Sequence, residues 1–210
     1  MSYDFLDIAV TPSVAAAQQA NGAGALWDKR GIDRPSDRFT TAEVQFIAER
    51  DSFYMASVSE TGWPYVQHRG GPPGFLRVLD DRTLAFADYR GNRQYISLGN
   101  LSANDRVALL LMDYPNRQRL KVYGSASYVD LTADPNLADK VASPGYRAKP
   151  ERIVQVRLEA FDWNCAQHII ARFTAGEFAE AFAPEPALQA QLEADNNDLR
   201  ARLAALGGLQ

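Results

Sequence analysis

The chain has 210 residues, 46% hydrophobic and 23% charged, and its net charge is −4. Such usage is typical of a globular protein and excludes a disordered polymer. A single cysteine, Cys165, and two histidines, His68 and His168, exclude a disulfide framework, a cysteine-based zinc site and a His-rich metal site. The first residues carry acids rather than a basic region, and no apolar run approaches the roughly 18 residues of a membrane span. We therefore expect a soluble, cytoplasmic protein without a metal site.

Charge is unevenly distributed along the sequence. Between Gly62 and Lys121, nine Lys or Arg stand against five Asp or Glu, which gives this stretch a net charge of +4 and leaves −8 for the rest. An acidic chain with a basic middle is not the pattern of a protein that binds nucleic acid through its whole surface. It favours a local pocket for one small anion.

The first part of the chain, 1–39, has the pattern of an irregular N-terminal arm with one Ala/Gln-rich helix over about 12–20. Thr40 and Glu43 then have the spacing of a capping box, and apolar residues follow them. A short helix over 41–50 is therefore expected.

The middle of the chain has the period of short strands joined by tight turns. The predicted strands are 53–59, 63–69, 75–80, 83–88, 106–114, 119–130 and 152–163, with a helix over 92–101 and a loop with a helical turn over 131–151. Six or seven strands are the number expected for a β-barrel. From Asn164 onward the pattern is helical, and leucines near one face predict a last helix that docks on the body or on a partner subunit.

Two segments of the basic middle are candidates for binding. In HRGGPPGFLRV (68–78), glycines and prolines interrupt a strand, which is typical of a bulge, a barrel corner or the close approach of a ligand, although a plain loop fits equally well. Arg69 beside the glycines offers a fork of donors for a phosphate or a ring carbonyl. In 87–104, Arg90, Asn92 and Arg93 gather at a predicted helix start, which suits a phosphate but also a solvated helix end.

Two further segments carry polar side chains in suggestive positions. Arg119 and Lys121 alternate with buried residues along one strand face, which indicates either solvated cations or a contribution to an anion site. Trp163, Asn164 and His168 lie close together after the last strand, where His168 is a candidate acid or base, although a histidine that caps or contacts a ring is the commoner case. The motifs of serine hydrolases, P-loop proteins and Rossmann folds are absent from the sequence.

This order of elements and motifs resembles the split-barrel flavin-binding proteins related to pyridoxamine 5'-phosphate oxidase, over about residues 40–165. The likeness is greatest to members without an assigned function that carry the HRGGPPGF and WNCxQHI stretches. It implies that a mainly β split barrel of six or seven strands with flanking helices occupies 40–173, between the arm (1–39) and a C-terminal helical extension (174–210). It also implies non-covalently bound FMN and a homodimer with flavin sites at the interface.

The resemblance assigns roles to individual positions. Gly91, Asn92 and Arg93 fall on the family's Ser-Arg-Lys phosphate triplet, so that Arg93 inherits the cationic role. The other implied cofactor-binding positions are Gln67, His68, Arg69, Gly70 and Gly71 on one strand, Phe86, Ala87 and Asp88 along the isoalloxazine, Arg119 in place of a family glutamine, Lys121, and Trp163, Asn164 and His168. Arg69 and Arg93 would contact the phosphate, and Arg119 or Lys121 would close the site.

The resemblance implies only part of the oxidase's function for this chain. The Arg and His with which the oxidase grips pyridoxal phosphate have no match here, because WNCAQHI stands in their place. The resemblance therefore implies an FMN-dependent oxidoreductase with a different, unidentified small-molecule substrate and an unknown catalytic residue. The alternatives are a non-catalytic flavin store or sensor, a haem-binding or deazaflavin-binding relative on the same barrel, or a barrel with an empty site that acts in assembly.

Overall fold

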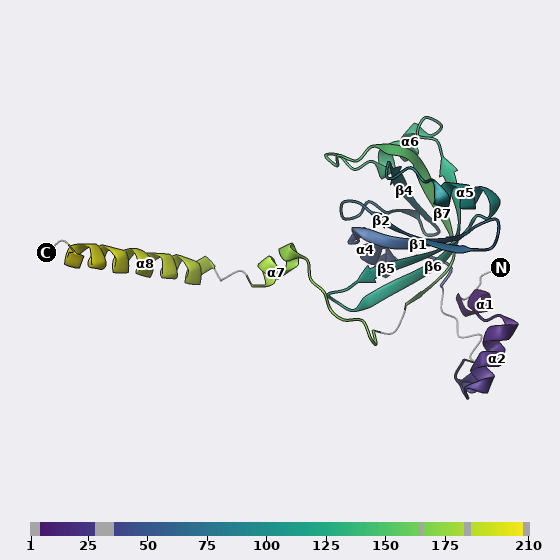
Figure 1. The fold of residues 1–210 in the computed structure, drawn as a ribbon, viewed down its shortest axis with the longest axis horizontal. Helices are drawn as coiled ribbons and strands as arrows, with labels where there is room; N and C mark the ends of the chain where they lie inside the picture. The colour runs from purple at the N-terminus through teal and green to yellow at the C-terminus, as the bar shows by residue number, and fades with distance from the viewer. Residues whose placement is uncertain (1–4, 28–35, 164–165, 183–185, 208–210) are drawn as a thin grey trace. The chain divides into compact units, whose positions relative to one another are not determined.

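The computed structural model describes residues 5–27, 36–163, 166–182 and 186–207 (Figure 1). The chain divides into two compact units, Met1–Ile170 and Ala171–Gln210. The first unit holds every strand of the described chain and is mainly β. None of the described helices is long and apolar enough to cross a membrane.

The helices and strands alternate along the chain as follows. The helices are α1 (Phe5–Ala9), α2 (Pro12–Ala20), α3 (Gly24–Trp27), α4 (Thr41–Ala48), α5 (Ile96–Ala103), α6 (Pro135–Val141), α7 (Ala175–Ala181) and α8 (Pro186–Gly207). The strands are β1 (Ser52–Val58), β2 (Pro64–Gly70), β3 (Arg77–Asp80), β4 (Thr83–Tyr89), β5 (Arg106–Asp113), β6 (Gln118–Val129) and β7 (Pro150–Trp163).

The seven strands form one antiparallel sheet in the order β2-β1-β5-β6-β7-β4-β3. Strands β2 and β3 are thus its two edges. The side chains of β5 and β6 alternate between buried and partly exposed, so one face of the sheet turns inward and the other outward. This alternation decides which predicted residues can share a site.

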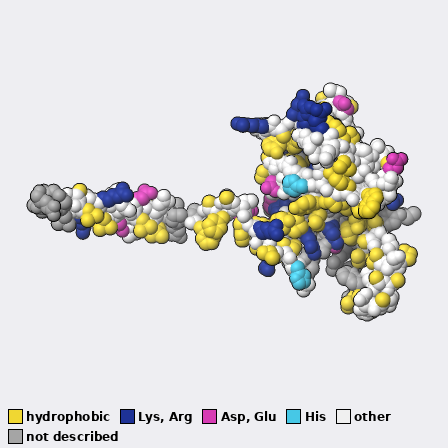
Figure 2. Space-filling view, in the orientation of Figure 1, with side chains coloured by type: hydrophobic (Ala, Val, Ile, Leu, Met, Phe, Trp, Pro, Cys, Tyr) yellow, Lys and Arg dark blue, Asp and Glu magenta, His cyan; other side chains and the backbone are white. Residues whose placement is uncertain are grey.

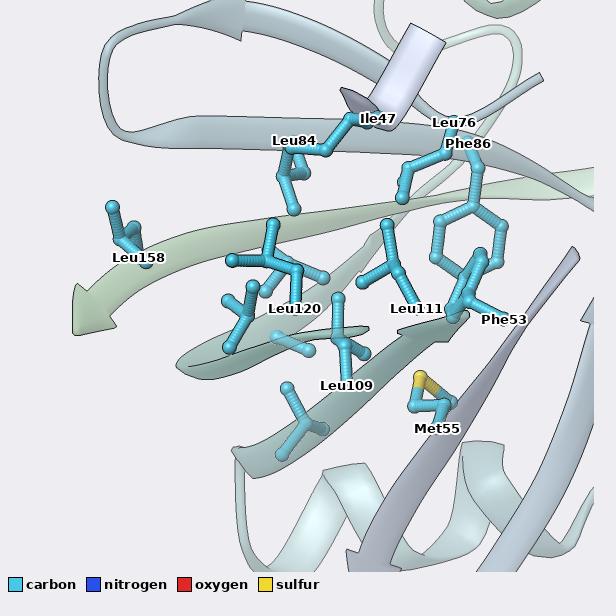
Figure 3. Close-up of a cluster of buried hydrophobic side chains, with 14 of the residues drawn as sticks. Ile47, Phe53, Met55, Leu76, Leu84, Phe86, Leu109, Leu111, Leu120 and Leu158 are labelled. Carbon is cyan, nitrogen blue, oxygen red and sulfur yellow. The ribbon is translucent and has the colours of Figure 1, made fainter. Parts of the chain in front are cut away.

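The inward face packs into one large hydrophobic cluster (Figure 3). Phe53 and Met55 of β1, Leu109 and Leu111 of β5, and Phe86 of β4 are at most 1% exposed. The predicted helix after Thr40 is present as α4, with its full capping box, and Ile47 at its end enters the same cluster. Buried apolar area of this kind is the main source of stability in the unit.

Helix α1 of the N-terminal arm packs on the outward face of the sheet through Phe5. The ring of Phe5 stacks on that of Tyr123 with centroids 4.5 Å apart, and the Phe5 amide donates to Ser36 Oγ. The predicted helix over 12–20 is confirmed as α2. In the second unit, α7 begins with a second capping box, from Thr174 to Glu177, and Leu192 and Leu199 of α8 are exposed.

Three predicted boundaries differ from the structure. The helix expected over 92–101 begins only at Ile96, because Arg93 and Tyr95 adopt left-handed backbone angles. The strand expected over 75–80 begins at Arg77, because Phe75 turns into the core from the preceding loop. Residues 166–174 are not helical, and His168 has a φ of 64°.

Candidate functional site

A polar cavity of about 50 Å³ lies between α5 and the strands β2, β4, β6 and β7. It brings together six of the predicted positions. These are Gln67, Arg69, Asp88, Gly91, Asn92 and Arg93. The volume suits a few water molecules or one small group, and not a ring system.

An ion cluster forms part of the cavity wall. Asp88 Oδ1 accepts a hydrogen bond from Arg69 Nη1 at 2.5 Å, and Asp88 Oδ2 accepts one from Arg152 Nη1 at 3.1 Å. Asp88 itself is 7% exposed. The guanidinium of Arg152 lies over the rings of Tyr95 and Tyr128, 5.1 and 5.7 Å from their centroids. Arg69, which the resemblance implies as a phosphate ligand, is thus paired with a carboxylate in the structure.

The turn that precedes α5 forms the opposite wall. Asn92 Oδ1 accepts the amide hydrogen of Gln94, and Arg93 and Tyr95 have φ values of 63° and 52°. Among the described residues, no side chain caps α5, while Ser97 Oγ in its first turn donates to Gln67 Oε1 at 2.9 Å. The first amides of an uncapped helix are unpaired donors with partial positive charge, which favour an anion.

Two buried polar atoms of the cavity lining have no partner among the residues that the structure describes. They are Arg69 Nε and the Tyr128 hydroxyl. Burial, and then the nearby charge of Asp88, raise the pKa of Tyr128 above its ordinary value of 10.0, although the charges of Arg69 and Arg152 and the close approach of the Arg69 side chain to the hydroxyl oppose them. The hydroxyl therefore stays protonated at neutral pH and is available as a donor.

Arg119 and Lys121 do not join this cavity within one chain. Residues paired across neighbouring strands share a face of the sheet. Arg69 is paired with the buried Phe53 of β1. Lys121 is paired with Leu110, and Leu110 is paired with Tyr54, the neighbour of Phe53 on β1. Since successive side chains on a strand alternate, Lys121 points to the outward face of the sheet. There it pairs with Asp162 at 3.2 Å and lies over the Phe5 ring. Within one chain, Arg119 and Lys121 therefore do not face the cavity that Arg69 and Arg93 line.

The outward face of β1, β5 and β6 carries an apolar groove of about 470 Å³. Figure 2 shows hydrophobic side chains gathered over β1 and β5 on this face. Val66 and Tyr54 are 61% and 37% exposed here. His68 also points outward and contacts the Tyr54 ring edge-on, so it is separated from the cavity.

The family of the chain follows from comparison with known proteins. The family model described as pyridoxamine 5'-phosphate oxidase matches residues 39–161, which is more than half of the chain. The chain belongs to the pyridoxamine 5'-phosphate oxidase family. Its seven-stranded sheet with flanking helices is accordingly a split barrel, as the sequence predicts. No curated protein matches the chain.

The matches to solved structures of similar fold extend over most of the length of each solved chain. A candidate pyridoxamine 5'-phosphate oxidase from Lactobacillus delbrueckii is 21% identical, with a TM-score of 0.47, and the match covers 62% of this chain and 97% of that one. An FMN-binding protein from Syntrophomonas wolfei is 13% identical, with a TM-score of 0.45 and coverages of 73% and 95%. An F420 reductase is 25% identical, with a TM-score of 0.40 and coverages of 55% and 93%.

Several predicted positions of this pyridoxamine 5'-phosphate oxidase family member have packing roles. The side chains of Phe86 and Ala87 are buried in two hydrophobic clusters, so only their backbone is left for a ligand. A Cβ on Gly71 would lie 2.6 Å from the Phe75 ring, and one on Gly70 would lie 3.0 Å from His68. The glycines thus permit the tight loop after β2, and neither lines the cavity in the described chain.

Trp163 at the end of β7 and the described residues that follow it are also separate from the cavity. Trp163 Nε1 donates to Glu43 Oε1 at 2.7 Å, and the indole packs edge-on against Phe46, so Trp163 fastens α4 to the sheet. His168 is exposed in a turn, outside the cavity lining of the described chain. Asn164 and Cys165 lie outside the described residues.

Sequence reasoning did not identify Arg152, Tyr95 or Tyr128 as site residues. Arg152 begins a strand that the sequence does predict, and it lies directly opposite Asp88 on β4. Arg152 and Asp88 are 64 residues apart in the sequence, so no local motif links them. Only the pairing of β4 with β7 brings them together.

Proposed function

We propose that this chain binds FMN non-covalently and that the cavity between α5 and the barrel holds the phosphate. The observation that supports the proposal is the pair of buried, unpartnered polar groups, Arg69 Nε and the Tyr128 hydroxyl, in a cavity that also contains an uncapped helix start. An unpaired buried donor costs about 1–3 kcal/mol, and a phosphate oxygen would relieve that cost. Arg93 adds a charge at the rim.

The donor set fits a phosphate better than it fits the rest of a flavin. The lining supplies guanidinium, hydroxyl and amide donors, which are the groups that hold phosphate oxygens. Because the cavity is small, the ring system would extend outside it. Bound flavin would supply hydride or electron transfer, and the role of the chain would be to orient the ring and to exclude water from it.

We propose further that the chain acts as a homodimer through the outward face of β1, β5 and β6. The apolar groove and the exposed side chains of Val66 and Tyr54 support this, because contiguous apolar surface of a sheet is costly to leave in water. In such a dimer, Arg119 and Lys121 of one protomer would approach a flavin whose phosphate is held by its partner. The interface would thereby complete each site.

Flavin titration tests the proposal. Purified chain is expected to be yellow, or to quench FMN fluorescence on titration with a single saturable site per protomer, and riboflavin is expected to bind more weakly because it lacks the phosphate. A colourless preparation that does not respond to FMN would contradict the proposal. Parallel titrations with haem and with a deazaflavin decide whether another cofactor takes the site.

We infer that the chain is an oxidoreductase with an unidentified substrate. Turnover of reduced nicotinamide by the FMN-loaded protein, with oxygen or a dye as acceptor, is the expected result. If FMN binds but its bound form is neither reduced nor reoxidised faster than free FMN, the chain is a flavin store or sensor instead.

A further inference from the structure

Asp88 occupies the position at which the cations of the cavity meet. Its two carboxylate oxygens accept hydrogen bonds from different strands, one from Arg69 on β2 and one from Arg152 on β7. The side chains of these three residues are only 10–19% exposed. A buried carboxylate between two arginines offsets the charge of both without any ligand, while Arg69 Nε stays unpaired.

The same carboxylate opposes a second anion. The charged groups of the cavity lining are Arg69, Arg93 and Arg152, opposed by Asp88 and Glu151. Two fixed negative charges therefore face any phosphate that enters, and like charges a few ångströms apart repel strongly where water is excluded. A phosphate would also compete with Asp88 for the donors of Arg69 and Arg152.

The second carboxylate, Glu151, is placed differently. It accepts from Arg152 Nη2 at 3.3 Å and lies 3.5 Å from Arg90, whose side chain is 46% exposed. Arg90 is not among the residues that line the cavity in the described chain, so Glu151 is offset by a cation from outside the site. Within the described residues, Asp88 forms ion pairs only with the two cavity arginines.

We propose that Asp88 sets the affinity and the specificity of this cavity for a phosphate group. In the ligand-free chain its carboxylate holds Arg69 and Arg152 in place, and on binding it competes with the ligand for them. This inference rests on the proposed flavin function. Asp88 is thus a specificity-determining residue that limits how far FMN is preferred over riboflavin.

The variant Asp88→Asn separates charge from shape. The amide has nearly the size of the carboxylate and keeps one acceptor oxygen, but it removes the negative charge. FMN is expected to bind about tenfold more tightly, because one repulsive charge is lost and the arginine donors are released. Riboflavin affinity is expected to stay the same. Most substitutions in a binding cavity weaken binding, so an increase restricted to the phosphorylated ligand is diagnostic.

Fluorescence titrations with FMN and riboflavin measure both affinities. The matched control is Asp81→Asn, which also neutralises an aspartate paired with an arginine, Arg38, but in a pair with both side chains about half exposed. It is expected to change neither affinity. Thermal unfolding with and without millimolar inorganic phosphate adds a readout that is independent of flavin. The Asp88→Asn variant should melt lower than the wild type without phosphate and should gain more from it.

Two outcomes would overturn the inference. A folded Asp88→Asn variant that binds FMN as weakly as the wild type, or more weakly, would show that Asp88 only positions the arginines. If Asp88→Asn does not fold, Asp88→Ser is tested for the same increase. Failure of both to fold even with phosphate would make the carboxylate a requirement of the fold alone. If wild-type chain binds no FMN, the proposed function fails, and the phosphate-dependent gain in melting temperature still decides the role of Asp88.

Discussion

Arg93 joins an exposed guanidinium to a backbone conformation that L-residues rarely adopt, with a φ of 63°. Such a conformation costs about 1 kcal/mol or more, and it persists where the surrounding structure imposes it. Here it turns the chain so that the 91–95 segment and the start of α5 face the same cavity. Because Arg93 also carries its charge at the cavity rim, it is a good target for testing the phosphate site.

The variant Arg93→Ala is expected to reduce FMN affinity by roughly 1.5–3 kcal/mol, or about 10- to 150-fold, through loss of a charge-assisted contact. Alanine has the same Cβ as arginine, so the backbone cost is unchanged and stability should not move. Fluorescence titration gives the affinity, with riboflavin as the ligand that lacks the contact. Equal losses for FMN and riboflavin would place Arg93 away from the phosphate.

Tyr128 offers a test in which stability and binding move in opposite directions. Because its buried hydroxyl approaches the Arg69 side chain but makes no hydrogen bond of good geometry within the described chain, Tyr128→Phe is expected to leave the melting temperature of the ligand-free protein unchanged or to raise it slightly. The same variant should bind FMN several-fold more weakly, since a donor to the phosphate is lost. A drop in melting temperature together with unchanged FMN affinity would contradict this role. Thermal unfolding and titration are done on the same preparation.

At the scale of elements, the start of α4 is predicted correctly from the local sequence. Thr40 and Glu43 predict a capping box, and the structure confirms it, because both partners lie within one turn and need no distant contact. The sequence does not indicate that Glu43 also accepts from Trp163, 120 residues away, since this bond depends on where β7 ends. Helix α5 is the converse case, because left-handed residues before it delay its start to Ile96.

The bonds to Glu43 predict a dependence of stability on pH. Burial favours the neutral form, but hydrogen bonds from Thr40 and Trp163 outweigh it, and the pKa of Glu43 lies below its ordinary value of 4.5. A depressed folded pKa means that the stabilisation is complete above pH 4.5 and is lost as the pH falls through the lower folded value. Acid titration followed by tryptophan fluorescence should show this loss.

The variant Glu43→Gln isolates that contribution. It is expected to be less stable than the wild type at pH 7 and to lose less stability on acidification below pH 4.5. Glu49→Gln, in which an exposed glutamate at the end of the same helix is neutralised, is the control and should follow the wild-type curve. If Glu43→Gln and the wild type lose stability in parallel, another carboxylate governs the acid transition.

At the scale of the whole molecule, Val66→Glu tests the proposed dimer. The side chain is 61% exposed in one chain, so the barrel should fold with the glutamate in place. A charge on the apolar outward face is expected to convert dimer to monomer, because an unpaired buried charge strongly opposes association. Val44→Glu, at an exposed position on α4, is the matched control. Sedimentation or light scattering measures the state; a wild-type monomer would contradict the dimer.

The whole fold was more predictable than the site. All seven strands were predicted, because alternating and buried runs such as 106–114 depend on local sequence alone. The site depends on which face each strand turns inward and on which strands pair. A single sequence gives no register for β4 and β7, so it does not identify Arg152, and it does not show that Lys121 lies on the opposite face of the sheet from Arg69.

The ion pair of Arg69 and Asp88 links two strands that are not neighbours in the sheet. Strand β2 is an edge with β1 as its sheet neighbour, while β4 lies at the other side of the sheet beside β7 and β3. Backbone hydrogen bonds of the sheet do not join β2 to β4, so side chains close this seam of the barrel. A ligand that draws Arg69 away from Asp88 would weaken the contact between β2 and β4. A ligand that bridges both strands would strengthen it. Amide exchange along β2 is therefore expected to report binding at a distance from the ligand itself.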